Sequence, residues 1–106
     1  MGKATATDKS KPLKFRVTFW VERNSKHVRG KKRSYENIKM LVLASYEMVR
    51  HSQGEYTIIV SYRDEQGLEE IIQNIIGEIH EQADWNNCLA EDVCLAVLDG
   101  SERMWN

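Results

Sequence analysis

The feature that most constrains the fold is the segment 65–84, in which apolar side chains recur at helical spacing and the opposite side is polar and acidic. Asp64 stands directly before the segment and can cap its first turn. Because an amphipathic helix buries its apolar stripe against another layer, the rest of the chain must supply that layer. The stripe consists of Leu68, Ile71, Ile72, Ile75, Ile79 and Ala83.

Two other segments alternate between apolar and polar residues, as strands with one buried face do. They are residues 14–23 and residues 55–63. A third run, 93–98, is apolar on both sides, which is typical of a central strand. The pair Asp99-Gly100 then predicts a tight hairpin turn into a short final strand.

A second helical pattern lies between the first two strands. Ser34 can cap a helix that runs to about Arg50 and stops before Gly54, the expected left-handed residue. Before this helix, residues 26–33 could form a polar edge strand. Met40 and Leu43 lie off the core-facing stripe, so we expect them to be covered by another element or by a partner. The predicted stripe is Tyr35, Ile38, Leu41, Val42, Ser45 and Val49.

These elements predict an α/β fold, with α+β as the alternative class. The expected order is strand, optional edge strand, helix, strand, helix, strand and optional final strand. We expect a two-layer sandwich with both helices on one face of a mixed sheet of three to five strands, because strand–helix–strand units favour parallel neighbours. The 106 residues suit a single domain over 13–106, after a disordered tail over 1–12.

Charge is divided unequally along the chain. Residues 1–63 contain fourteen Lys or Arg and five Asp or Glu, whereas residues 64–102 contain eleven acids and no Lys or Arg. Such asymmetry between halves is a sign of interaction surfaces. We therefore expect the folded chain to present a basic patch and a separate acidic patch.

The densest basic stretch is residues 23–33, RNSKHVRGKKR, which contains six Lys or Arg and no acid. Exposed cations contact phosphates without a fixed spacing, and an aromatic side chain on an open sheet face can stack on a base. The alternatives are a solvated turn that protects a sheet edge and a surface for an acidic protein. The predicted nucleic-acid-binding residues are Arg16, Trp20, Arg23, Lys26, Arg29, Lys31, Lys32, Arg33 and Arg63.

The acidic face of the 65–84 helix supports a different hypothesis, a regulator or inhibitor that docks on a basic protein. The alternative is a solvated face that aids solubility. Basic and acidic surfaces of neighbouring copies could also pair in a homo-oligomer. The predicted partner-binding residues are Met40, Leu43, Glu69, Glu70, Glu81 and Asp84.

The sequence shows no motif for catalysis or cofactor binding. It has no glycine-rich phosphate loop and no nucleophile elbow. His80, Asp84 and Cys88 recur at intervals of four, but no fourth metal ligand accompanies them. We therefore predict a binding module without cofactor or metal, with an enzyme as the third hypothesis. Without a long apolar run or a signal peptide, the expected location is cytoplasmic and no membrane partner is expected.

Overall fold

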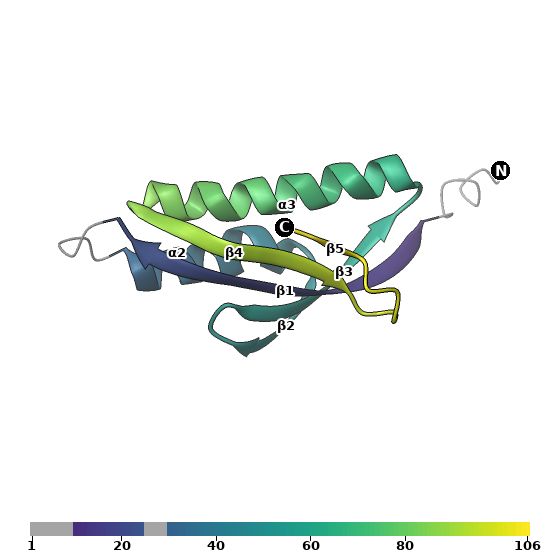
Figure 1. The fold of residues 1–106 in the computed structure, drawn as a ribbon, viewed down its shortest axis with the longest axis horizontal. Coiled ribbons are helices and arrows are strands. Elements are labelled where there is room, and N and C mark those ends of the chain that lie inside the picture. The colour runs from purple at the N-terminus through teal and green to yellow at the C-terminus, as the bar shows by residue number, and fades with distance from the viewer. Residues whose placement is uncertain (1–9, 25–29) are drawn as a thin grey trace.

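The computed structural model describes residues 10–24 and 30–106. They form an α+β fold with a five-stranded antiparallel sheet, in the order β2-β3-β1-β4-β5 (Figure 1). The helical elements are α2 (Lys31–Asn37), which continues as a π-helical turn (Ile38–Val42) and a 3-10 turn (Leu43–Ser45), and α3 (Glu65–Trp85). The strands are β1 (Lys11–Arg23), β2 (Glu47–Ser52), β3 (Glu55–Tyr62), β4 (Cys88–Val97) and β5 (Met104–Trp105).

β1 is the central strand, because it pairs antiparallel with β3 on one edge and with β4 on the other. β3 and β4 therefore run parallel to each other but are separated by β1, so the prediction of parallel neighbours is wrong. The alternation expected in the first two strands is present, and the apolar side chains of β1 all face the core. These side chains are Phe15, Val17, Phe19 and Val21.

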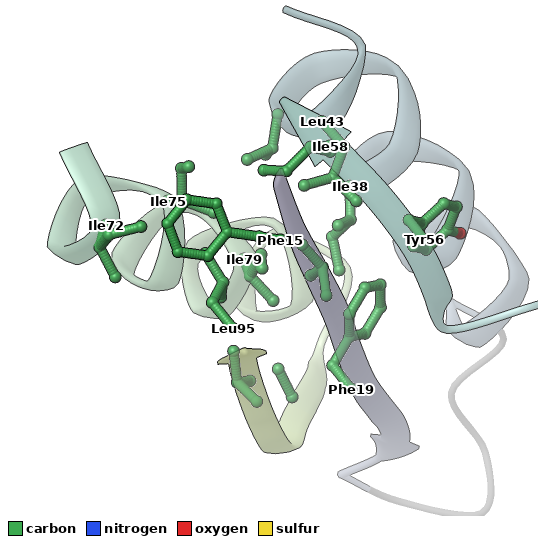
Figure 2. Packing of buried hydrophobic residues seen from close by; sticks show 14 of the residues in the cluster. Phe15, Phe19, Ile38, Leu43, Tyr56, Ile58, Ile72, Ile75, Ile79 and Leu95 are labelled. Atoms are coloured by element: carbon green, nitrogen blue, oxygen red, sulfur yellow. The ribbon is translucent and has the colours of Figure 1, made fainter. Parts of the chain in front are cut away.

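α3 agrees closely with the sequence pattern. The Asp64 carboxylate caps the helix by accepting a hydrogen bond from the Gly67 backbone N–H at 2.7 Å. The predicted stripe is fully buried except for Ile71, which is half-buried. Figure 2 shows Ile72, Ile75 and Ile79 among the core side chains, close to Phe15 of β1. Within the described ranges, no helix is both long enough and apolar enough to cross a membrane.

The sequence prediction is wrong for residues 46–52. The pattern predicts a helix that runs to Arg50, but these residues form β2, which pairs with β3. Gly54 lies in the turn of this hairpin with a φ of 84°. β2 gives the outer edge of β3 a hydrogen-bonded neighbour, and this tertiary pairing outweighs a local helical pattern. The order is therefore strand, helix, two strands, helix and two strands.

The start of the first helical segment also differs from the prediction. The segment begins at Lys31, so Ser34 is not its cap but a buried residue inside α2. The helix also occupies residues 31–33, so the prediction of an edge strand over 26–33 is wrong for those three residues. Residues 26–29 of the predicted strand lie outside the described residues.

The π-helical turn reverses the predicted exposure of two leucines. Because an i→i+5 turn holds more residues than an α-helical turn, the buried stripe is delayed by about one residue. Leu43 is fully buried, and Leu41 is 59% exposed. The prediction that Leu43 faces a partner is therefore wrong, whereas Met40 lies at the surface with 60% of its area exposed.

The boundaries of β1 and β4 correct three smaller predictions. β1 already pairs with β3 at Lys11 and Pro12, so a disordered tail does not extend to residue 12. β4 begins at Cys88 rather than at residue 93, and a bulge with a φ of 55° at Asp92 shifts its register against β1. Residues 98–103 connect β4 to the short final strand β5, in place of a tight turn.

Replacing Gly54 with Ala tests how closely the β2–β3 turn approaches β1. A Cβ at Gly54 would lie 2.5 Å from the Phe19 carbonyl oxygen, whereas Gly100 has a similar φ of 85° and open space around it. We expect Gly100→Ala to lower the free energy of unfolding by about 1 kcal/mol through the backbone alone. Gly54→Ala should lower it by about 3 kcal/mol, measured by urea denaturation. Equal losses would contradict the close approach.

Candidate nucleic-acid interface

α2 lies beside the part of β1 that extends beyond β3. Within the described residues, β3 begins opposite Thr18. Beyond that point the Phe19 N–H donates to the Gly54 carbonyl at 3.0 Å, and the Val21 N–H donates to the Tyr35 hydroxyl at 2.9 Å. A side chain of α2 therefore replaces the missing strand and fixes the helix at this end of β1.

Tyr35 is held in place by more than its hydrogen bond. Its ring stacks on Phe19 with the two centroids 5.6 Å apart. Burial raises the pKa of the Tyr35 hydroxyl, although the hydrogen bond from Val21 partly opposes this shift. The position of α2, and with it the position of Lys31, Lys32 and Arg33, therefore depends on a packed aromatic side chain.

Trp20, Glu22 and Lys31 form an exposed cluster at this end. Trp20 Nε1 donates to Glu22 Oε2 at 2.6 Å, and Lys31 Nζ lies 3.8 Å from Glu22 Oε1. Lys31 Nζ also lies 4.3 Å from the centroid of the Trp20 ring. The hydrogen bond from Trp20, together with the nearby charges of Lys31 and Arg23, lowers the pKa of the Glu22 carboxyl despite slight desolvation.

Lys31 covers one face of the Trp20 ring, so a base would stack on the other face or displace the Lys31 ammonium. An exposed cation–π contact contributes about 0.5–1 kcal/mol. Stacking of one base on an aromatic side chain contributes about 1–3 kcal/mol. A base can therefore outcompete the lysine, which would then be released to contact a phosphate.

Lys32 and Arg33 are exposed in the first turn of α2, where no acidic residue accompanies them. Neither makes an ion pair with another described residue, and neighbouring Glu36 pairs with Lys39 at 3.4 Å instead. Cations are unfavourable in the first turn because the helix dipole is positive there. Stabilisation of the helix therefore does not explain why Lys32 and Arg33 occur in its first turn.

The remaining predicted nucleic-acid contacts are divided. Arg23 is exposed at the end of β1, next to the cluster. Arg16 pairs with Glu55 at 2.5 Å, so its charge is already compensated. Arg63 follows the residue that pairs with Lys11, at the opposite end of β1, roughly 33 Å of strand away from Trp20. Lys26 and Arg29 lie outside the described residues. The structure thus brings together Trp20, Arg23, Lys31, Lys32 and Arg33.

The predicted acidic residues all lie on α3 but have different surroundings. Glu69 accepts hydrogen bonds from Trp105 Nε1 at 2.9 Å and from Gln73 Nε2 at 3.0 Å, and these bonds lower its pKa. Glu70 is exposed. Glu81 and Asp84 border a groove between α3 and the start of β4. This groove is lined by Gly77, His80, Glu81, Asp84, Cys88, Leu89 and Ala90.

Sequence reasoning did not identify this groove, although it noted the spacing of His80, Asp84 and Cys88. All three residues line the groove, yet no group of three or more His, Cys, Asp or Glu side chains in the described ranges could hold a metal ion. In the sequence, the signal that could have located the groove is Leu89, a large apolar residue between Cys88 and Ala90. In the structure Leu89 is 51% exposed at the beginning of β4.

The basic cluster and the acidic groove meet at the β1–β4 pair, because Glu22 pairs with Leu89 and Arg23 pairs with Cys88. Tyr35 bonds the edge of β1 that β3 uses, whereas the groove involves β4 on the other edge. No ion pair between described residues joins α2 to a carboxylate of α3. α2 and the groove therefore lie on different edges of β1, while the β1 residues of the cluster lie beside the groove-lining residues of β4.

Comparisons with known proteins place no constraint on these surfaces. No family model matches the chain, no curated protein is similar to it, and no solved structure matches it.

The pKa of Glu22 tests the geometry of the cluster. Because the folded pKa is lowered, the bond to Trp20 persists above that pKa and is lost as the pH falls through it. We expect Trp20→Phe to raise the pKa of Glu22, and Lys31→Ala to raise it by less, in an NMR titration of the Glu22 carboxyl carbon. Trp85→Phe is the control, since Trp85 is 75% exposed on α3. A Glu22 pKa unaffected by Trp20→Phe would exclude the hydrogen bond.

Proposed function

We propose that the protein is a small, non-enzymatic binding module that contacts single-stranded nucleic acid through the basic end, defined as Trp20, Arg23, Lys31, Lys32 and Arg33. The observation that carries this proposal is the docking of α2 beside β1, which puts Lys31 over an exposed tryptophan and leaves Lys32 and Arg33 exposed in the same helical turn. Within the basic end and the residues between Trp20 and Arg23, Glu22 is the only acid. The expected cytoplasmic location forms part of the proposal.

The arrangement suits a flexible, charged strand with exposed bases. Lys32 and Arg33 can contact phosphates from an exposed helical turn, and such contacts need no exact spacing. Trp20 offers one ring face to a base, as aromatic side chains do in proteins that bind single strands. We infer a two-layer arrangement in which both helices cover one face of the sheet and leave the face beside Trp20 open.

A second candidate function is a protein-binding regulator or inhibitor. It is favoured by the exposed carboxylates of Glu81 and Asp84 at the groove, and by the exposed apolar pair Met40 and Leu41 on the π-helical turn. The groove borders the basic end, so the two functions are distinguished by variants that change one set of charged residues at a time.

Charge reversal at α2 tests the contribution of phosphate contacts. We expect Lys32→Glu with Arg33→Glu to weaken binding of a fluorescent single-stranded oligonucleotide by at least about tenfold, measured by anisotropy. The plot of log affinity against log salt should also become shallower by about 1.4, which is about 0.7 for each lost phosphate contact. Lys11→Glu with Arg63→Glu is the matched control, because it changes the net charge equally at the other end of β1. Equal losses in the two variants would contradict a localised interface.

Replacement of Trp20 tests stacking separately from charge. We expect Trp20→Leu to weaken oligonucleotide binding by about 5–150-fold, which corresponds to the loss of about 1–3 kcal/mol of stacking. The salt dependence should stay the same, because no phosphate contact is removed. Met104→Ala removes another large exposed apolar side chain, on β5, and should leave the affinity unchanged. Unaltered binding by the Trp20 variant would show that bases do not stack there.

A further inference from the structure

The outer edge of β4 carries an unpaired stretch. β5 pairs only with Leu95 and Ala96, so residues 88–93 have no strand beside them within the described part of the chain. Figure 1 shows β4 continuing past β5 toward the C-terminal end of α3. An exposed strand edge presents unpaired backbone groups on which another extended chain can pair.

The hydrogen-bonding register shows which backbone groups this edge presents. The Asn24 N–H donates to the Asn87 carbonyl at 3.2 Å, and the same register continues through the pairs of Glu22 with Leu89 and Trp20 with Glu91. Because bonded and non-bonded pairs alternate in an antiparallel ladder, Leu89 and Glu91 bond to β1. The N–H and C=O groups of Cys88 and Ala90 therefore point away from β1. Because Cys88 is fully buried, only the groups of Ala90, which is 9% exposed, can be reached by another chain.

The same stretch borders the groove, which gives a bound chain a wall of defined chemistry. His80, Glu81 and Asp84 of α3 line one side, and Cys88, Leu89 and Ala90 of β4 line the other. Glu91 and Asp92 are exposed just beyond the groove on the strand itself. No Lys or Arg occurs in residues 64–102, so a cation at this groove must come from another part of the chain, such as Arg23 opposite Cys88, or from a partner.

We propose that the β4 edge over residues 88–91 binds a short, extended, basic segment of a partner protein by β-strand addition. Backbone bonds to Ala90 hold the segment, and side chains at alternate positions face the carboxylates of Glu81 and Asp84. The bulge at Asp92 interrupts the regular edge and limits the length of the bound segment. This inference develops the second candidate function and does not depend on nucleic-acid binding.

Charge also decides against a second copy of the chain as the occupant. Pairing of β4 with β4 of another copy would bring two sets of Glu91 and Asp92 close together, and like charges on neighbouring strands are destabilising. The edge strand β2 contains one acid and one Arg, so it lacks the positive charge that the groove favours. A basic segment with alternating Arg or Lys fits the edge better than either.

Amide hydrogen exchange of the unmodified protein provides the first test. The probe is a synthetic peptide of alternating Arg and Val with blocked ends. We expect the Ala90 amide to exchange at least about tenfold more slowly when the peptide is bound, while the Arg50 amide of β2 keeps its rate. A peptide of alternating Glu and Val should have no effect. An unprotected Ala90 amide, or equal protection by the Glu peptide, would overturn the proposal.

Charge-reversal variants provide the second test. Glu81→Lys with Asp84→Lys should weaken peptide binding by about tenfold, whereas Glu47→Lys with Glu102→Lys changes the net charge equally away from the groove and should not. Lys32→Glu with Arg33→Glu should also leave peptide binding intact, so failure here is distinguishable from failure of the nucleic-acid proposal. Equal losses in the two Glu/Asp→Lys variants would overturn the proposal. So would slower Ala90 exchange at high protein concentration without peptide, because it would assign the edge to a second copy.

Discussion

The structure depends on the pairing of β1 on both of its edges. Its inward row of Phe15, Val17, Phe19 and Val21 is almost completely buried, and it contributes to one core with the isoleucines of α3 and with Tyr35 of α2. Large apolar side chains in such a core each stabilise the fold by roughly 2–5 kcal/mol relative to Ala. Every other element is positioned by its contact with this strand or with a strand that pairs with it.

Both candidate surfaces arise because β1 and its neighbours have different lengths. β3 begins opposite Thr18, so on this edge of β1 no strand lies beside Val21. There the Tyr35 hydroxyl accepts the Val21 N–H and holds the cations of α2 at this end of β1. On the other side, β4 follows β1 as far as Arg23, but β5 covers only Leu95 and Ala96. The basic end and the free β4 edge are thus two consequences of incomplete strand pairing, and they adjoin where β1 pairs with the start of β4.

The elements that could be predicted are those whose local pattern and tertiary environment agree. α3 has a cap and an uninterrupted stripe, and β1 and β3 alternate as one-sided strands do. β2 could not be predicted, because its residues suit a helix locally and become a strand only by pairing with β3. The predicted exposures of Leu41 and Leu43 were reversed for a similar reason: Leu43 is buried and Leu41 is exposed because of the π-helical turn, which depends on how the helix packs against its neighbours. Among the candidate site residues, the sequence could identify the cations but not that Glu55 compensates Arg16.

The amino-acid sequence by itself determined the type of its longest elements, the burial of the α3 stripe and the division of charge between the two parts of the chain, because these properties depend on residues close together in the sequence. Only the tertiary structure decided which cations are neighbours, which strands lie side by side and which backbone edge remains open. Those properties depend on contacts between distant residues, such as Val21 with Tyr35 or Trp20 with Lys31, and no local pattern encodes such contacts.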